Sequence, residues 1–459
     1  MIFMSSIGLD KTKVSVYNDT RSKILDLIKP SNSQINKEKE FVDAILKKIK
    51  DYPGSHIDSL VAGSFARDTN LKDSKDFDIF VLYPPETKKE DFVKEGLDIG
   101  RFVFKGHFSE KVYSQHPYLR GVIDGYKLEI IPAYKIETTE NLISAVDRTP
   151  FHLNFILKNI KSSQKDDVRL LKYFLKNIGC YGADSQYQGF SGYLCELLVI
   201  YYGDFLKVLE KVANWQTPVR IVLDSQDIDY LSPFNDPLVV IDPVDKKRNV
   251  ASAVSLTQLS RFIAASRSFL QNPTLDFFTN KIIKEQPYHQ LVSWIKGNPL
   301  LVIEFNVNDL VKDIVWSKTR KLSNRLICAL ESTGYNVLKS QIYYTEGDKE
   351  AYLLVLVDTL ELPKLEKVVG PHVHDIINSQ KFIENSKTVF GPFVVDDRWV
   401  AIRNRRYVDI GHITEEIVKD TFDLSVNIFV DEDIMNAYTK NIEIMKYFAE
   451  FFYPKEKFL

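Results

Sequence analysis

Residues 56–83 read HIDSLVAGSFARDTNLKDSKDFDIFVLY, and two strands with a turn between them are predicted in this stretch. The run from Ile57 to Ala62 is short, mostly apolar and followed by a glycine, which predicts a β-strand. Gly63-Ser64 predicts a tight turn, and a short helical stretch is expected from Phe65 to Asn70. A second apolar strand is predicted over 76–83. The stretch therefore predicts two strands of one sheet, joined by a turn and a short helix.

The second predicted strand carries two carboxylates. Because side chains alternate between the two faces of a strand, Asp76 and Asp78 share one face while Phe77 points into the core. Two adjacent carboxylates repel each other unless a cation lies between them, and Mg²⁺ prefers such oxygen ligands and commonly bridges to nucleotide phosphates. Gly63 and Ser64 offer backbone N–H groups and a hydroxyl, which suit phosphate. Together these features predict a Mg²⁺-nucleotide site.

Each feature alone has an ordinary explanation. An isolated Asp-x-Asp is usually a solvated strand end or turn, and an isolated Gly-Ser is almost always a turn. Here Gly63-Ser64 and Asp76-Phe77-Asp78 are separated by 12 to 15 residues, and each is attached to an apolar strand. This combination favours the functional interpretation.

Length and composition indicate an ordinary globular protein. A chain of 459 residues predicts about two to four domains, and 44% hydrophobic and 27% charged residues are typical of soluble proteins. The cysteines are too few and too scattered for a disulfide framework or a zinc site, which favours a reducing cytoplasm. They are Cys180, Cys195 and Cys328.

No membrane segment and no general affinity for nucleic acid are predicted. The N-terminus lacks the features of a signal peptide, and the most apolar stretch, 193–205, contains Glu196 and Asp204 and is too short to span a bilayer. The net charge is only −2, so a nucleic-acid partner requires local basic surfaces on a balanced protein.

The first 275 residues predict a sheet domain followed by a mainly helical one. A mostly antiparallel or mixed sheet backed by helices is expected up to about residue 150. In the helical part, Arg169, Lys172 and Lys176 fall on one basic stripe of a helix, and a buried helical stretch is expected over 188–214. The further elements expected in this part are helices 17–29, 34–51, 89–104 and 255–271 and a strand at about 126–134.

The remaining residues predict a small α/β sandwich of the kind often used for RNA binding. A β-hairpin is expected around Glu346-Gly347-Asp348, a short helix over 362–370 and a closing helix over 431–452. The other expected elements are strands 300–305, 313–316, 337–345 and 350–357 and an amphipathic helix 318–333. A separate module over 371–425 contains a run of arginines.

The turn and carboxylate strand resemble the nucleotidyltransferase superfamily that includes DNA polymerase β, poly(A) polymerases and CCA-adding enzymes. That superfamily has a third carboxylate on a neighbouring strand, and the resemblance points to Glu129 in the segment YKLEIIPAY at 126–134. Leu128 and Ile130 are expected to face the core while Glu129 faces the site. This position is commonly Asp in the superfamily, and Glu is one methylene longer.

Five segments in a fixed order resemble the archaeal (class I) CCA-adding enzymes, which add C, C and A to tRNA 3′ ends without a nucleic-acid template. They are 63–67, 147–152, 168–182, 189–197 and 242–249. The resemblance implies an α+β multidomain fold with a polymerase β-like head of mixed sheet and helices. The implied domains are head 1–150, helical neck 151–275, α/β body 276–370 with 426–459, and a small tail 371–425.

The resemblance also implies roles for individual residues. Asp76, Asp78 and Glu129 would bind two Mg²⁺ ions, and Gly63, Ser64 and Arg67 would contact the triphosphate. The nucleotide-binding residues implied in the second part are His152 for phosphate or sugar, Lys172 for phosphate, Tyr181 against the nucleotide and Arg248 for base selection.

These four residues have alternative explanations. His152 could be a capping or core residue, Lys172 a solvated lysine and Tyr181 a helix-end packing residue. Arg248 could form an ion pair with Asp242 or Asp245. Two later basic clusters, Lys318 with Arg320, Lys321 and Arg325, and Arg398 with Arg403, Arg405 and Arg406, are either tRNA-phosphate contacts or ordinary exposed faces.

The implied activity is that of a cytoplasmic CCA tRNA nucleotidyltransferase. It would use Mg²⁺ as cofactor, ATP and CTP as substrates and tRNA as partner, with no membrane involved and a homodimer as one option. The alternatives are a poly(A) polymerase, an oligoadenylate synthetase-like enzyme, or an RNA-binding protein with a degenerate head. All three carboxylates are present, which argues against degeneracy.

Overall fold

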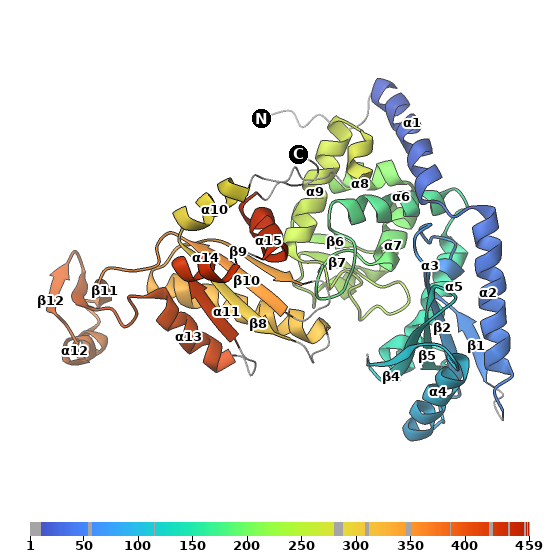
Figure 1. Cartoon of the computed structure of the whole chain (residues 1–459), viewed down its shortest axis with the longest axis horizontal. Coiled ribbons are helices and arrows are strands. Elements are labelled where there is room, and N and C mark those ends of the chain that lie inside the picture. Colours follow the sequence, from blue (N-terminus) through green and yellow to red (C-terminus); the bar gives the residue numbers. More distant parts are fainter. Residues whose placement is uncertain are drawn as a thin grey trace. The chain divides into compact units, whose positions relative to one another are not determined.

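The computed structural model divides the chain into two compact units, Met1–Ile282 with Glu456–Leu459, and Ile283–Lys455 (Figure 1). It describes residues 11–53, 57–113, 115–279, 288–307, 312–345, 350–385, 387–421, 426–438, 441–453, 456 and 458. His56 and the predicted turn at 346–348 lie outside these ranges. Each unit is described by itself below.

The first unit contains a mixed five-stranded sheet in the order β1-β2-β5-β4-β3. β2 and β5 are parallel and all other neighbours are antiparallel. The strands are β1 (Asp58–Val61), β2 (Asp76–Tyr83), β3 (Ser109–Tyr113), β4 (Pro117–Ile123) and β5 (Tyr126–Tyr134), and the short helix α3 (Gly63–Ala66) follows β1. The predicted mixed sheet is confirmed, although β3 and β4 were not predicted.

One face of this sheet is covered by α2 (Asn32–Lys50) and α4 (Lys89–Val103). Phe77 of β2 is only 2% exposed and packs in this core, and Leu128 and Ile130 of β5 are fully buried there. The alternation of the strands therefore leaves Asp76, Asp78 and Glu129 on the opposite face, as predicted.

The second half of this unit is mainly helical. Its α-helices are α5 (Thr149–Asn159), α6 (Gln164–Asn177), α7 (Gly192–Tyr202), α8 (Phe205–Val212) and α9 (Leu256–Gln271). Helix α1 (Lys11–Ile28) joins their core, where the ring of Tyr17 stacks on Phe205 with 6.1 Å between centroids. The shorter elements are the strands β6 (Val219–Ile221) and β7 (Leu238–Val240) and the 3₁₀ helices Thr139–Asn141, Ala145–Arg148, Ser225–Leu231 and Leu275–Phe278.

The helical stretch predicted over 188–214 consists of two helices, α7 and α8, rather than one continuous helix. Gly203 has a φ of 111°, a conformation that breaks α7. Asp204 then caps α8, because its side chain accepts a hydrogen bond from the backbone N–H of Lys207.

The second unit is built on an antiparallel sheet in the order β14-β8-β10-β9. Its strands are β8 (Leu300–Asn306), β9 (Val337–Tyr344), β10 (Glu350–Val357) and β14 (Val426–Val430). Helices α11 (Lys312–Thr333) and α13 (Ile410–Thr421) share one core with the sheet, and α10 (Tyr288–Gly297), α14 (Glu432–Tyr438) and α15 (Ile442–Phe452) share a second core with its other face.

Three predictions for this unit were wrong. The strand expected at 313–316 is the start of α11, because a short apolar run does not distinguish a strand from a buried helix segment. The helix expected over 362–370 is largely the strand β11 (Leu365–His372). The closing helix expected over 431–452 is divided into α14 and α15.

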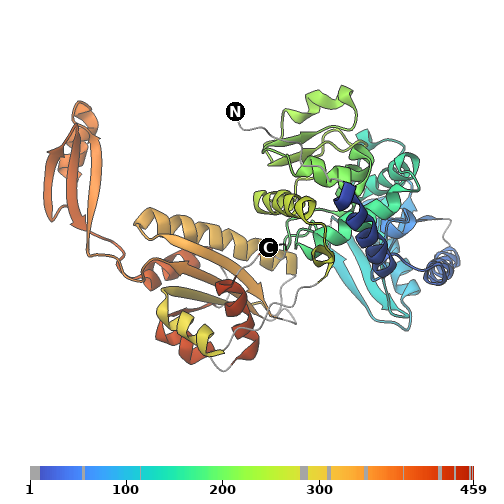
Figure 2. The ribbon, with the colours of Figure 1, turned by 90° about the horizontal axis from the view of Figure 1, so that it is seen from above.

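A separate three-stranded sheet, in the order β11-β13-β12, interrupts the second unit between β10 and α13 (Figure 2). It consists of β11, α12 (Ile376–Asn385), β12 (Phe390–Val395) and β13 (Arg398–Asn404). At its base, the backbone N–H of Leu362 donates to the carbonyl oxygen of Val408 at 2.8 Å. The N–H of Ile410 donates to the carbonyl oxygen of Leu360 at 3.1 Å.

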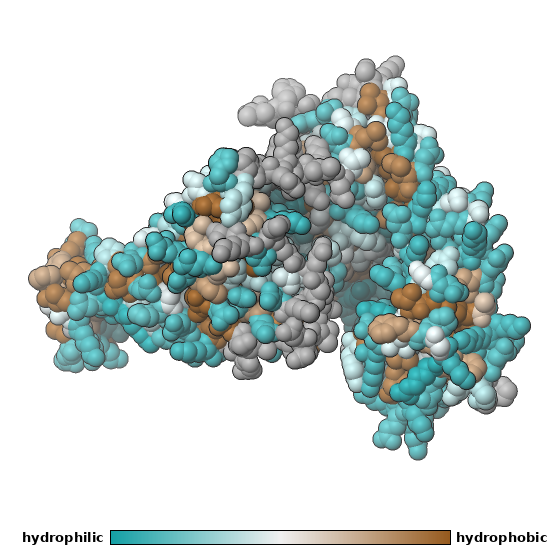
Figure 3. All heavy atoms as spheres, viewed as in Figure 1, coloured by the Kyte–Doolittle hydropathy of each residue, from teal (hydrophilic) through white to brown (hydrophobic). Residues whose placement is uncertain are grey.

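The small sheet exposes apolar side chains, which gather over β11 and β12 (Figure 3). Phe390 is 59% and Val369 55% exposed. Across both units, none of the helices in the described part of the chain combines the length and hydropathy that crossing a bilayer requires.

Candidate active site

The three predicted carboxylates come together on the open face of the first unit's sheet. Asp78 of β2 and Glu129 of β5 are directly paired in register, and Asp76 lies two residues earlier on the face of Asp78. Burial, followed by the negative charges of Glu129 and Asp76, raises the pKa of Asp78 to about 6. The site thus concentrates negative charge that a bound cation would relieve.

Gly63 allows the turn to approach this carboxylate. A Cβ atom added at Gly63 would lie 2.5 Å from Oδ2 of Asp78, closer than any side chain tolerates. The φ of Gly63 is 71°, in the left-handed region that favours glycine. The predicted association of the Gly-Ser turn with the Asp-x-Asp strand is therefore a direct contact.

The donor set suits a divalent ion, although the side chains are not gathered around one point. Among the described residues, no group of three or more His, Cys, Asp or Glu side chains is arranged to hold a metal ion. The Nε of Arg120 donates to Oε1 of Glu129 at 2.6 Å, so Glu129 faces a guanidinium. Asp76 and Asp78 offer carboxylate oxygens on one face, and Glu129 on the adjacent strand carries a third carboxylate, which is paired with Arg120.

Two cavities meet at Asp76. The first, of about 420 Å³, is lined by Asp76, Asp78 and Glu129 together with Phe77, Phe108, Glu110, Arg120, Gly121, Val122 and Lys127. The second, of about 200 Å³, is lined by Asp76 with Ser64, Thr69, Leu71, Asp73, Ser74, Lys172, Lys176 and Tyr181. The predicted residues Ser64, Lys172 and Tyr181 therefore share a cavity that opens beside the carboxylates.

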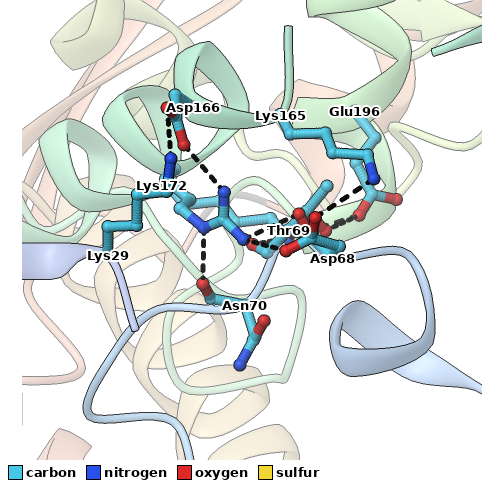
Figure 4. Close-up of polar contacts among 9 residues, drawn as sticks. Lys29, Asp68, Thr69, Asn70, Lys165, Asp166, Lys172 and Glu196 are labelled. Carbon is cyan, nitrogen blue, oxygen red and sulfur yellow. Dashed lines mark hydrogen bonds and ion pairs between the residues drawn. The ribbon is translucent and has the colours of Figure 1, made fainter. Parts of the chain in front are cut away.

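Lys172 is buried, which contradicts its interpretation as a solvated lysine. Its side chain is bound between Thr69 and Glu196 (Figure 4), with Nζ 3.1 Å from the Thr69 carbonyl oxygen and 3.3 Å from Oε1 of Glu196. Burial lowers the pKa of Lys172, although the charge of Glu196 opposes this shift. Lys172 thus belongs to a buried ion pair rather than to a basic surface stripe.

Arg67 is held by the same carboxylate. Its Nε lies 2.9 Å from Oε2 of Glu196, and Arg67 is only 7% exposed. Burial alone would raise the pKa of Glu196, but the charges of Lys172 and Arg67 hold that pKa below its ordinary value. Two of the predicted phosphate-binding cations are therefore fixed by one buried acid.

The loop at 68–70 connects the sheet to the helices through further polar contacts. Arg169 of α6 is 1% exposed and donates to the carbonyl oxygens of Asp68 at 2.8 Å and Asn70 at 2.9 Å. Lys165 of the same helix contacts Asp68 at 3.1 Å (Figure 4). Lys29, which directly follows α1, contacts Asp166 of α6 at 2.8 Å. The basic stripe predicted on this helix thus binds the sheet part instead of facing water at Arg169 and Lys172.

Tyr181 lies where the helical part closes on this cavity. The backbone of Tyr181 forms an isolated parallel β-bridge with that of Phe190. A Cβ atom added at Gly192 would lie 3.1 Å from the Tyr181 hydroxyl and 3.4 Å from Cε of Lys172. Burial raises the pKa of Tyr181, so its hydroxyl stays protonated.

His152 and Arg248 meet at a second buried carboxylate. Nε2 of His152 and the NH1 group of Arg248 lie 2.9 Å and 2.7 Å from Oδ2 of Asp242, which is fully buried. Tyr193 donates to Oδ1 of Asp242 at 3.2 Å and its ring lies 4.1 Å from that of His152. Burial would raise the pKa of Asp242, but the hydrogen bond and charge of His152, with those of Arg248, lower it.

The ion-pair alternative for Arg248 is therefore confirmed for Asp242. Asp245 instead pairs with Arg148, whose Nε lies 2.6 Å from Oδ2 of Asp245. Since the side chain of Arg248 remains 36% exposed, this pairing leaves part of it accessible.

Comparison with known proteins assigns these features to a family. Family models match residues 42–152 (nucleotidyltransferase domain), 166–279 (tRNA nucleotidyltransferase, second domain) and 296–439 (CCA-adding enzyme, C-terminal domain). The CCA-adding enzyme of Methanocaldococcus jannaschii is 34% identical over 438 residues, covering 92% of each chain. That of Pyrobaculum aerophilum is 36% identical over 434 residues, covering 92% of this chain and 98% of its own.

The chain belongs to the CCA-adding enzyme family. The predicted family and the predicted α+β fold with a nucleotidyltransferase head are thereby confirmed. A solved structure of the Cid1 poly(U) polymerase is similar at 17% identity and a TM-score of 0.45, covering 59% of this chain and 98% of that one. The roles of the individual site residues stay predictions.

Among the buried acids that organise this member of the CCA-adding enzyme family, sequence reasoning gave Glu196 no role and named Asp242 only as a possible ion-pair partner of Arg248. Glu196 is the one charged residue in the α7 sequence GYLCELLVIYY, and a lone charge inside an apolar helix signals a buried ion pair. Asp242 directly follows the buried strand β7 and one further apolar residue. Arg120 had no such signal, because its strand was not predicted.

Proposed function

We propose that this chain is a Mg²⁺-dependent CCA tRNA nucleotidyltransferase that adds and repairs the 3′-terminal CCA of tRNA from CTP and ATP. The observation that carries the proposal is the position of Asp76 between two cavities. One cavity contains the carboxylates, and the other contains Ser64, Lys172 and Tyr181. This arrangement supports a site where a nucleoside triphosphate and an RNA 3′ end meet at one acidic centre.

Asp76, Asp78 and Glu129 are the proposed metal-binding residues. A bound divalent ion supplies activation of the tRNA 3′-hydroxyl and stabilises the charge of the leaving pyrophosphate. The pairing of β2 with β5 holds the backbone of Asp78 in place, and Gly63 lies against its carboxylate. The chain itself thus fixes the Asp78 carboxylate, which supports precise positioning of the reacting groups.

Lys172, Arg67 and Ser64 are proposed to bind the triphosphate. Because Glu196 holds Lys172 and Arg67 by ion pairs, both cations are in position before a nucleotide arrives. Such preorganised charge stabilises a phosphoryl-transfer transition state without rearrangement during the reaction. Tyr181, on the same cavity, is proposed to contact the nucleotide.

Arg248 is proposed to select the base, and His152 to contact phosphate or sugar. Asp242 binds both side chains through one oxygen and so fixes the direction of the Arg248 guanidinium. The guanidinium N–H groups not used by Asp242 can donate to acceptors on the edges of C and A. This supports base selection by a protein side chain rather than by a nucleic-acid template.

Recognition of tRNA is proposed for the second unit. Lys318 and Lys321 are exposed on α11, and tRNA would be bound there through backbone phosphates and A-form shape. In the later cluster, Arg403 pairs with Glu366 at 2.7 Å and Arg406 with Glu416 at 2.9 Å, so these arginines are weaker candidates. The division into head 1–150, neck 151–275, body and tail remains a proposal, as does a cytoplasmic setting.

The test is incubation of the protein with tRNA that ends at the discriminator base. Stepwise addition of C, C and A in the presence of Mg²⁺, CTP and ATP is expected. Incorporation of ATP alone would indicate a poly(A) polymerase or oligoadenylate synthetase-like enzyme. Binding of tRNA without any incorporation would indicate an RNA-binding protein. An unselective homopolymer tail would also contradict the proposal.

A further inference from the structure

Arg120 lies between two carboxylates on the open face of the sheet. On β4 it is the register partner of Glu129 on β5 and of Glu110 on β3. All three side chains line the cavity of about 420 Å³ that contains Asp76 and Asp78. A single guanidinium thus has an acidic neighbour on each side.

In this structure Arg120 is bound to Glu129. Its Nε donates to Oε1 at 2.6 Å, and its NH2 group donates to the Tyr118 hydroxyl at 3.3 Å. The side chain of Arg120 is 45% and that of Glu129 24% exposed, so the pair is partly screened by water. A partly exposed ion pair is weak enough to open when a stronger ligand competes.

Glu129 cannot serve two cations fully at once. The oxygen that accepts from Arg120 is one of the two that the side chain offers to a divalent ion, and the guanidinium carries a like charge close to that ion. Glu129 is one methylene longer than aspartate. The longer side chain lets the carboxylate of Glu129 reach either toward Asp76 and Asp78 or toward Arg120.

We propose that Arg120 is an internal counter-cation that pairs with Glu129 in the metal-free protein and transfers to Glu110 when a divalent ion takes Glu129. Arg120 is then a positioning residue that sets the affinity of the site for metal. This inference rests on the proposed metal site of Asp76, Asp78 and Glu129. Glu110 is exposed and lies on the same face as Arg120, so the transfer needs only side-chain rotation.

A second basic residue beside the site provides a matched control. Nζ of Lys127 lies 4.0 Å from Oδ1 of Asp76, and their side chains are 71% and 62% exposed. Lys127 lines the same cavity as Arg120 but makes a looser and more solvated ion pair. Removing either residue takes one positive charge from the cavity, but only Arg120 directly occupies a proposed ligand oxygen.

The experiment measures Mn²⁺ binding to the full chain, without nucleotide or RNA, by electron paramagnetic resonance of the free ion. The Asp78-dependent binding is defined as the part that Asp78→Asn removes. Arg120→Gln should tighten it by roughly two- to fivefold, the range of a partly exposed ion pair. Lys127→Gln should change it by less than about twofold. Unfolding curves establish that each variant is folded.

Transfer to Glu110 makes a further prediction. Glu110→Gln removes the second acceptor for Arg120, so it should weaken Mn²⁺ binding in the wild-type background. In the Arg120→Gln background the same substitution should have a much smaller effect, because there is no guanidinium to transfer.

The outcomes distinguish the role of Arg120 from the metal site itself. An Arg120→Gln protein that binds Mn²⁺ no more tightly than wild type, or a Lys127→Gln protein that gains as much, would overturn the role of Arg120. An equal effect of Glu110→Gln in both backgrounds would overturn the transfer. Wild-type protein with no Asp78-dependent binding would overturn the proposed metal site, and this inference with it.

Discussion

The Nζ atom of Lys172 lies 3.1 Å from the carbonyl oxygen of Thr69, so a lysine of helix α6 is bound by the loop that leads toward β2. Glu196 of α7 completes this contact from a third segment. The loop and two helices therefore fix the cation together. The position of a proposed phosphate-binding group is thus set by the core of the protein.

Glu196→Gln should strongly destabilise the first unit. The variant leaves Arg67 and Lys172 buried without their carboxylate, and breaking a buried ion pair in this way costs about 3–5 kcal/mol. Urea unfolding measures the loss. Asp98→Asn is the control, because Asp98 pairs with Arg101 on the surface and should cost less than about 1 kcal/mol. Equal losses in the two variants would contradict this role for Glu196.

Gly63→Ala should reduce activity beyond its effect on stability. The added Cβ would lie 2.5 Å from Oδ2 of Asp78 and displace that carboxylate. Gly125→Ala is a matched control, because Gly125 also has a positive φ, of 79°, and its Cβ would meet no atom within 4 Å. Both variants should lose roughly 1–2 kcal/mol of stability through backbone strain. Only the first should lose nucleotide incorporation as well, and equal activity in both would exclude the contact from the mechanism.

Asp78→Ala should abolish nucleotide addition while tRNA binding persists. Loss of a central metal ligand removes several kcal/mol of transition-state stabilisation, which corresponds to a decrease of at least ~1000-fold in rate. Incorporation assays and filter binding of tRNA measure the two properties. Asp58→Ala on β1, whose carboxylate pairs with Lys135 in solvent, should leave both nearly unchanged. Retained activity of Asp78→Ala would overturn the metal assignment.

Asp242 should make stability depend on pH in the acidic range. Its pKa in the folded protein lies below the ordinary value of 3.8, so the unfolded chain takes up this proton more readily. The stability from its contacts with His152 and Arg248 is therefore present above about pH 4 and is lost as pH falls through the lowered pKa.

The comparison of wild type with Asp242→Asn tests this dependence. The difference in unfolding free energy, measured from pH 6 to pH 3, should shrink below about pH 4. Asp229→Asn, at an exposed position, should differ from wild type by less than about 0.5 kcal/mol throughout. A difference for Asp242→Asn that grows on acidification would contradict the assignment.

Lys318→Gln and Lys321→Gln should weaken tRNA binding in a salt-dependent way. If each lysine contacts one phosphate, each substitution should reduce the slope of log affinity against log salt by about 0.7–0.9. Lys47→Gln, on the exposed side of α2, provides the control with the same change of charge. Unchanged slopes for both α11 variants would remove this face from the proposed tRNA surface.

The parts predicted from sequence are those with strong local periodicity. β2 and β5 were predicted because Phe77, Leu128 and Ile130 alternate with polar residues, and the same alternation placed Asp78 and Glu129 on one face. β3 and β4 were missed because 109–123 contains Pro117, Gly121 and several charges, which weaken the strand signal. As a result, the partner of Glu129 on β4 could not be predicted.

The burial of charged groups also escaped prediction. A lysine at helical spacing on a basic stripe has the same sequence signature whether it faces water or a loop from a distant segment. Lys172 is buried only because Thr69, 103 residues earlier, packs over it. Such a contact depends on tertiary structure, which a local pattern does not contain.

The base of the small sheet in the second unit affects how the chain folds. Two backbone hydrogen bonds join the entry of this segment to its exit. The N–H of Leu362 donates to the carbonyl oxygen of Val408, and the N–H of Ile410 donates to that of Leu360. The entropic cost of closing this segment rises only slowly with its length. Residues inserted between the two bonds therefore add little to the cost of assembling the main sheet. The segment is therefore an insertion whose length and sequence can change while α13 still packs against α11 and β14.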